Sequence, residues 1–151
     1  MLIADISPAT DENLARALLS VQHAAYAVEA ALIRDDRIPP LHEDLDGLRD
    51  AQLQWIGAFI AGELVGAVAW AEQVDELDID RLVVDPRAHR RGIGLALVHE
   101  LLTRAGNRRT SVATGRDNAP ADALYKRLGF LRVDDQEVLP GLWVARYTHL
   151  P

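Results

Sequence analysis

Two glycines at the start of an expected helix mark a place where a phosphate can bind. Gly92 and Gly94 precede an apolar run at helical spacing, within the segment from 82 to 97. The first turn of a helix has backbone N–H groups without partners and the positive end of the helix dipole, so it attracts anions. Three residues that can carry positive charge stand just before the glycines: His89, Arg90 and Arg91. We therefore expect this segment to hold a phosphorylated molecule; the alternative is a turn that only needs a flexible backbone.

Two common phosphate motifs do not fit the spacing around these glycines. A P-loop continues with Lys and then Ser or Thr, whereas Gly94 is followed by Leu95 and Ala96. A dinucleotide-binding fingerprint needs a small residue at the position of Leu97. The phosphate-binding segment therefore belongs to another kind of site.

Three carboxylates alternate along an expected strand just before this segment. Glu76, Asp78 and Asp80 would point to one face, with neighbouring Cβ atoms about 6.5 Å apart. Mutual repulsion would raise the pKa of some of them into the range of a general base. The alternative is a solvated acidic face, since carboxylates usually face water. No metal site is expected, because no histidine or further carboxylate is spaced to complete one.

The apolar positions of the same strand change parity. They are Leu77 and Ile79 at first, and then Leu82 and Val84. Because strand side chains alternate strictly between faces, the change requires one extra residue. We predict a β-bulge near Asp80 or Arg81, a feature often found beside active sites.

The remaining periodicity predicts a mixed α/β (α+β) sheet. Only the strand–helix–strand unit from 76 to 114 demands a parallel crossover; the hairpins make the rest antiparallel. On the first helix, Glu12, Arg16, Gln22 and Glu29 are expected on the face away from the sheet, and Ile38-Pro39-Pro40 should stop any helix. The expected strands are 2–6, 55–60, 64–70, 76–84, 110–114, 130–133 and 142–147. The expected helices are 12–34, 43–52, the segment from Gly92 to Gly106, and 119–128.

Composition narrows the function. The chain has 151 residues, which suits a single domain, residues 1–151. Its formal charge of -7 argues against nucleic acid as a partner and suits a cationic substrate. It has no cysteine, which excludes disulfides and thiolate chemistry. Neither a signal peptide nor a membrane span is visible, so we expect a cytoplasmic protein that does not use a membrane.

A second motif lies one strand beyond the glycines. The run from Asn118 to Phe130 reads Asn-Ala-Pro-Ala-Asp-Ala-Leu-Tyr-Lys-Arg-Leu-Gly-Phe. It resembles the second motif of the GNAT superfamily of N-acetyltransferases, Asn-x-x-Ala-x-x-Leu-Tyr-x-x-x-Gly-Phe, and the glycine pair resembles the first, Arg/Gln-x-x-Gly-x-Gly/Ala. The resemblance covers roughly residues 55 to 133. It implies the GNAT fold, with helices on both faces of a mostly antiparallel sheet.

The resemblance also implies transfer of acetyl from acetyl-CoA, as co-substrate, directly to an amine. The coenzyme would contact backbone and side chains of Leu82, Val83, Val84, His89, Arg90, Arg91, Gly92, Ile93, Gly94, Leu95, Asn118, Ala121 and Tyr125. The leading Arg or Gln of the family aligns with His89, so Arg90 or Arg91 would carry the charge role.

The catalytic roles implied by the resemblance fall on the strand and on the second motif. Tyr125 would protonate the leaving thiolate as general acid; the alternative is that it only packs the helix against the sheet. Asp78 matches the position of a catalytic glutamate in several members. The backbone N–H of Val83 or Val84 would stabilise the oxyanion.

The acceptor is expected to be a small cationic primary amine. Acidic and aromatic side chains on or near the expected pocket would bind it through charge and cation–π contacts: Tyr26, Glu29, Glu43, Trp70 and Trp143. Two alternatives remain, a protein lysine or N-terminal acetyltransferase and a non-catalytic CoA-binding sensor. The last strands offer edges for a homodimer.

Overall fold

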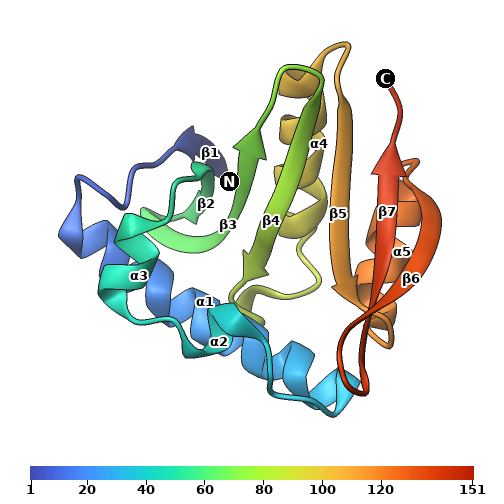
Figure 1. Ribbon diagram of the computed structural model, residues 1–151. Coiled ribbons are helices and arrows are strands. Elements are labelled where there is room, and N and C mark those ends of the chain that lie inside the picture. The colour runs from blue at the N-terminus through green and yellow to red at the C-terminus, as the bar shows by residue number, and fades with distance from the viewer.

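The structure is a computed structural model that describes all 151 residues. Seven strands form one sheet in the order β1-β2-β3-β4-β5-β7-β6 (Figure 1). All neighbours are antiparallel except β4 and β5. The strands are β1 (Leu2–Asp5), β2 (Gln54–Ile60), β3 (Glu63–Glu72), β4 (Glu76–Val84), β5 (Arg109–Gly115), β6 (Leu131–Leu139) and β7 (Leu142–His149). The predicted mixed sheet with one parallel crossover is confirmed.

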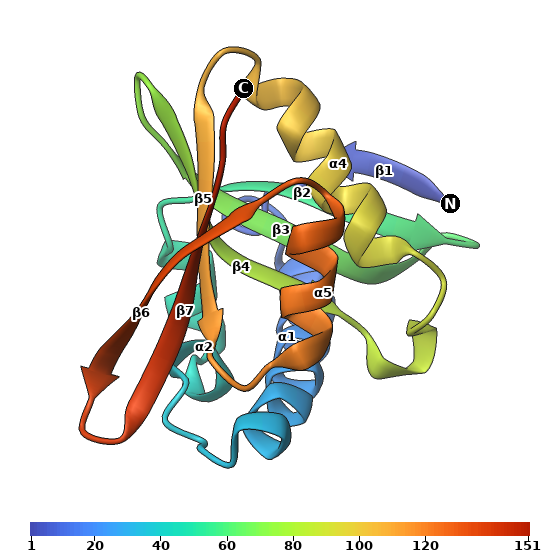
Figure 2. The ribbon, with the colours of Figure 1, turned by 90° about the vertical axis from the view of Figure 1, so that its right-hand side faces the viewer.

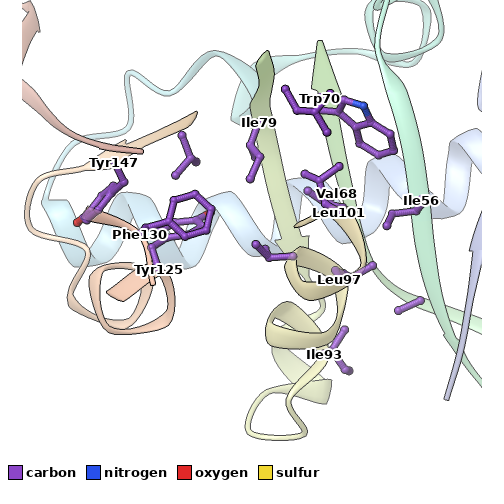
Figure 3. Close-up of a cluster of buried hydrophobic side chains, with 14 of the residues drawn as sticks. Ile56, Val68, Trp70, Ile79, Ile93, Leu97, Leu101, Tyr125, Phe130 and Tyr147 are labelled. Carbon is purple, nitrogen blue, oxygen red and sulfur yellow. The ribbon is translucent and has the colours of Figure 1, made fainter. Parts of the chain in front are cut away.

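Helices cover both faces of the sheet (Figure 2). They are α1 (Glu12–Ile33), α2 (Pro39–His42), α3 (Leu45–Asp50), α4 (Ile93–Ala105) and α5 (Ala119–Arg127), with a 3-10 turn η1 (Pro86–Ala88) before α4. Under α4, Leu97 and Leu101 pack with Val68 and Ile56 in the larger core (Figure 3). A smaller core lies under α1 and α3. None of the helices is both long and apolar enough to cross a membrane.

Helix α1 begins and ends as its caps dictate, but its polar face differs from the prediction. Asp11 accepts a hydrogen bond from the N–H of Leu14 at 3.1 Å, and Arg34 closes the helix in the left-handed conformation. Gln22, expected on the outer face, is fully buried because it accepts a hydrogen bond from Arg81 of β4. Glu29 also turns inward, toward β5. The sequence pattern could not reveal partners that come from another element.

The segment with two prolines contains a helix after all. Pro39 is the first residue of the single turn α2, a position where the missing N–H of proline leaves no hydrogen bond unmade. The prediction that Ile38-Pro39-Pro40 stops any helix was therefore wrong: α1 has already ended at Ile33, and the prolines begin a new helical turn.

Strand β4 carries the predicted bulge. Ala69 of β3 pairs with Arg81 and Trp70 pairs with Ile79, so Asp80 is the extra residue. Because of this extra residue, the side chains that face the core under α4 change from odd-numbered to even-numbered positions, as predicted. Leu77, Ile79, Leu82 and Val84 all contact the core under α4, whereas Val83 contacts the core under α1.

Beyond the bulge, β4 and β5 separate. Their parallel pairing runs only from Glu76 opposite Arg109 to Ile79 opposite Val112. Figure 1 shows the two strands diverging toward their carboxyl ends. The backbone of β4 after Ile79 therefore has no strand partner on this side, which opens the sheet at one place.

Strand β6 is longer than predicted. It runs from Leu131 to Leu139, and all of its residues are exposed. An edge strand without a buried face shows no alternation of apolar and polar residues, so only its first residues could be recognised.

Candidate active site

The loop before α4 presents a row of free backbone donors. None of the N–H groups from Arg90 to Leu95 donates a hydrogen bond to the backbone, and the first to do so is that of Ala96, to Gly92 O at 3.0 Å. Arg90 (φ 65) and Gly92 (φ 72) are both left-handed, and such alternation of backbone conformation turns successive N–H groups toward one side. The side chains of His89, Arg90 and Arg91 are exposed. This loop, called here the anion cradle (residues 89–95), has the geometry that an anion requires.

The two glycines serve different purposes. A Cβ at Gly92 would meet no atom within 4 Å, so this glycine is needed for its left-handed φ and leaves the surface open. A Cβ at Gly94 would lie 3.1 Å from Leu124 Cδ1, with side chains of Val84 and Leu82 also near. Gly94 therefore lets α4 approach α5 and β4 closely, a packing role that the sequence did not indicate.

A cleft of about 240 Å³ lies where β4 and β5 diverge. Its walls include Asp80, Arg81 and Leu82 of β4, the last residues of β5, and Asn118, Ala121 and Tyr125 around α5. Leu82 lies beside Gly94, so the cleft leads toward the anion cradle. The side chain of Val83, one of the two predicted oxyanion donors, is fully buried under α1, and the β4 residues that line the cleft are Asp80, Arg81 and Leu82.

Tyr125 is both buried and part of the cleft wall. It is 3% exposed, and its ring packs against Phe130 and Tyr147, with centroids 5.2 and 5.5 Å away. Burial raises the pKa of its phenol well above the ordinary value, and the nearby charge of Glu29 adds to the effect. The hydroxyl is protonated at neutral pH, as it would be at its ordinary pKa, and the raised pKa makes it a weaker acid.

Glu29 and Asn118 join α1 to the end of β5. The Oε1 atom of Glu29 accepts hydrogen bonds from Thr114 Oγ1 at 2.9 Å, Gly115 N at 3.1 Å and Asn118 Nδ2 at 3.2 Å. The other end of the amide, Asn118 Oδ1, accepts from Ala121 N at 3.2 Å and caps α5. Both residues line the cleft, and this cross-link fixes the wall made by β5.

Arg81 is a residue of the cleft wall that the sequence did not single out. It is 7% exposed and donates to Glu43 Oε1 at 2.7 Å, Asp80 Oδ2 at 2.6 Å and Gln22 Oε1 at 3.0 Å. Burial alone would lower its pKa, but the bonds to Glu43 and Asp80 raise it, so the guanidinium stays charged. The sequence does contain a hint: Arg81 stands two residues before the apolar Val83 in the same strand, so both side chains point to the same buried face.

Glu76 and Asp78 lie together on β4 before the bulge, outside the cleft. Ser111 of β5 donates its hydroxyl to both, at 3.2 Å from Asp78 Oδ1, and Arg109 Nη2 lies 3.2 Å from Glu76 Oε2. The pKa of Asp78 is raised, first by desolvation and then by the charges of Glu76 and Asp80, against the Ser111 bond. Repulsion was the predicted cause, but desolvation is the larger one. Asp80 itself is paired with Arg81.

The amino-acid sequence matches the model of a known family. A model of the acetyltransferase (GNAT) family fits residues 17–130 of the chain. The chain belongs to this family. The family and the mixed α/β fold are therefore as the sequence predicts.

Two relatives of this GNAT chain differ in length. UPF0157 protein YqkA of Bacillus subtilis (strain 168) is 30% identical over 142 residues, which are 93% of this chain and 41% of that protein. N-alpha-acetyltransferase RimI of Mycobacterium tuberculosis (strain H37Rv) is 32% identical over 136 residues, 87% of this chain and 84% of that protein. The chain thus spans less than half of the first relative and most of the second.

A solved structure has the same fold. PaiA N-acetyltransferase from Thermoplasma acidophilum, in complex with coenzyme A, superposes with a TM-score of 0.74 over 99% of this chain and 100% of that one. The two are 16% identical, so the likeness concerns the fold.

The structure brings together only part of the acceptor set predicted for this GNAT chain. Tyr26 and Glu29 line the cleft, and burial raises the pKa of Tyr26. Glu43 is held in its ion pair with Arg81. Trp143 lies outside the cleft with Arg116 over its ring at 4.7 Å, and Trp70 is buried beside a different cavity. The sequence could not show that Trp70 and Trp143 lie outside this cleft, because a tryptophan in a strand does not reveal which cavity its ring faces.

Proposed function

We propose that the protein transfers acetyl from acetyl-CoA to the primary amine of a small cationic acceptor. The observation that carries this proposal is the cleft between β4 and β5, which has a buried tyrosine on its wall and leads toward the free N–H groups of the anion cradle. A phosphate group, a narrow chain and a reacting carbonyl would follow one another along it. We propose the cytoplasm as the place of the reaction.

The residues present fit coenzyme A. The N–H groups from Arg91 to Leu95 would bind the pyrophosphate, and the exposed side chains of His89, Arg90 and Arg91 would add charge. The unpaired backbone of β4 after Ile79 would bind the amide groups of the pantetheine arm, as a neighbouring strand would. Leu82 and Ala121 would contact the arm's apolar parts.

Tyr125 would act as the general acid. When the amine nitrogen attacks the thioester carbonyl, the C–N bond forms and the C–S bond breaks, so the leaving sulfur needs a proton. Tyr125 is protonated at neutral pH, and the negative charge that develops on the sulfur would draw this proton from it, against the raised pKa of the buried phenol. The phenolate would then recover a proton from the amine through water.

Asp78 is the proposed base, acting through water because it lies outside the cleft. Its raised pKa makes it more basic than an ordinary aspartate. Glu76, tied to Ser111 and Arg109, would hold the pair in place. Asp80 is less suited, because Arg81 neutralises it. The oxyanion would be met by a backbone N–H of β4 at the cleft, in the stretch from Asp80 to Leu82.

The outer end of the cleft supports a small acceptor. Arg37 Nη2, on the loop after α1, donates to Pro140 O at 2.9 Å, on the turn between β6 and β7. This bridge joins the two segments that flank the cleft and leaves less room for a polypeptide. Glu29 and Tyr26 on the inner wall offer a carboxylate and an aromatic ring to a cation.

The test measures the release of CoA from acetyl-CoA with two sets of acceptors. The first set contains small amines, namely polyamines, aminoglycosides and amino acids. The second set contains peptides with free N-termini. Saturable turnover with a small amine supports the proposal. If only peptides are acetylated, the acceptor class is wrong. If acetyl-CoA binds but no amine is acetylated, the protein is a CoA-binding sensor and not an enzyme.

The second candidate is acetylation of a protein N-terminus. The observation that favours it is the relative N-alpha-acetyltransferase RimI, 32% identical with 84% of its length covered. In that case the Arg37–Pro140 bridge would have to open, so Arg37→Ala should increase turnover with peptides.

Pairing of two copies along the exposed strand β6 stays a prediction.

A further inference from the structure

Most cationic side chains of this acidic protein are already paired with carboxylates. The five Lys and Arg side chains that have no carboxylate oxygen within 4.0 Å are Arg34, Arg90, Arg91, Arg116 and Arg127. Arg116 lies over the ring of Trp143 instead. Arg90 and Arg91 belong to the anion cradle. Arg127, near the end of α5, remains without an assigned role.

Helix α5 has one side toward β6 and β7 and the opposite side toward α4. On the first side, Asp122 accepts a hydrogen bond from Tyr147 Oη at 2.6 Å, and the ring of Tyr125 packs on that of Tyr147. On the opposite side, Leu124 Cδ1 lies 3.1 Å from the place of a Cβ at Gly94, in the first turn of α4. Figure 2 shows α5 running alongside the beginning of α4.

Arg127 lies on the side that faces α4. Residues three apart on a helix are neighbours on its surface, so Arg127 follows Leu124 one turn later. Its side chain is exposed, so its charge is not used inside the protein. The adjacent Lys126 points the other way and pairs with Asp122 at 3.0 Å. The anion cradle is thus bordered, toward α5, by a free guanidinium.

We propose that Arg127 binds the 3′-phosphate of coenzyme A and thereby distinguishes coenzyme A from its 3′-dephospho form. The ribose joins this phosphate to the pyrophosphate through a few bonds, so it lies at the rim of the cradle when the pyrophosphate occupies the N–H groups. A guanidinium donates two parallel hydrogen bonds to a phosphate. The assignment rests on the coenzyme site of the proposed function, but not on its acceptor or its catalytic residues.

The test measures the affinity of the protein for coenzyme A and for 3′-dephospho-coenzyme A by calorimetry at low ionic strength. The unaltered protein should bind coenzyme A more tightly. Arg127→Gln should lower the affinity for coenzyme A about fivefold, since a charge-assisted bond at an exposed position is worth about this factor. The same change should leave the affinity for the dephospho form unaltered, because that ligand has no group for Arg127 to bind.

Two control variants separate this contact from other effects of the charge. Both Lys126 and Arg127 stand in the last turn of α5, where a cation stabilises the helix. Lys126→Gln removes the same charge from the other side of the helix, and should leave both affinities unchanged. Arg127→Lys keeps a cation at the rim, and should retain most of the preference for coenzyme A.

Two results would overturn the proposal: an Arg127→Gln variant with unchanged affinity for coenzyme A, or one that loses as much affinity for the dephospho form. Because no acceptor is present, a failure to find an acetylated amine does not alter these measurements. The absence of any coenzyme A binding to the unaltered protein would overturn the role of Arg127 together with the coenzyme site.

Discussion

Arg81 donates to the carboxylate of Glu43 at 2.7 Å, which ties the bulged strand β4 to the loop between α2 and α3. The pair is almost enclosed, with side-chain exposures of 7% and 19%. Arg81 also holds Asp80, the extra residue of the bulge. The shape of the strand at the cleft therefore depends on a carboxylate far away in the sequence.

Removing this carboxylate should destabilise the protein. Glu43→Gln leaves the buried guanidinium with one neutralising partner, Asp80, and we expect a loss of about 2–3 kcal/mol in the free energy of unfolding. Urea denaturation measures it. The control is Glu12→Gln, which removes exposed ion pairs with Arg16 and Arg49 and should cost less than about 1 kcal/mol. Equal losses in the free energy of unfolding for the two variants would show that the Arg81–Glu43 pair contributes no more to stability than the exposed pairs do.

Gly92→Ala should separate backbone strain from coenzyme binding. The alanine must adopt a left-handed φ, at a cost of about 1–2 kcal/mol, and its methyl group enters the open surface of the anion cradle. We expect acetyl-CoA affinity, measured by calorimetry, to fall about tenfold or more. The matched control is Gly62→Ala, with φ +78 and equal space but in the hairpin between β2 and β3. It should lose similar stability and keep full affinity; a parallel loss of affinity would contradict the cradle.

Tyr125→Phe should lower kcat about a hundredfold, the usual effect of losing a general acid, while KM for acetyl-CoA changes little. Steady-state kinetics with an active amine measure both. Tyr147→Phe is the control, because its hydroxyl donates to Asp122 at 2.6 Å and lies in the same aromatic cluster. That variant should lose stability and keep kcat. An unchanged kcat for Tyr125→Phe would leave Tyr125 a packing residue only.

Much of this site can be predicted from the sequence. The remaining parts could not be predicted, and for one common reason. The bulge at Asp80 could be predicted because alternation along a strand is strict, and the cradle because glycines at a helix start leave few alternatives. The burial of Gln22 and Arg81 could not be predicted, since it depends on partners from three separate elements. The place where β4 and β5 diverge could not be predicted either, since it depends on where β5 stops pairing with β4.

The pH dependence of kcat should report Asp78. Burial raises its folded-state pKa above the ordinary value of about 3.9. On acidification, the carboxylate therefore becomes protonated, and stops acting as a base, at a higher pH than an ordinary aspartate would. The same raised pKa makes its contribution to stability largest at low pH, and that contribution is lost as the pH rises through the folded-state pKa.

Asp78→Asn tests this assignment. It should remove the acidic limb of the kcat profile and lower kcat at neutral pH, whereas Asp117→Asn, at an exposed position in the turn after β5, should preserve both. A limb that survives in the Asp78→Asn variant would assign the base to another group.

The most direct measurement is an amide NMR titration of the protein with coenzyme A. The account predicts that the largest shifts fall on the N–H groups of Arg91 to Leu95, which have no backbone partner, and on β4 from Asp80 to Leu82, which has no strand partner on the β5 side. Shifts confined to other parts of the chain, with these amides unmoved at saturation, would contradict it.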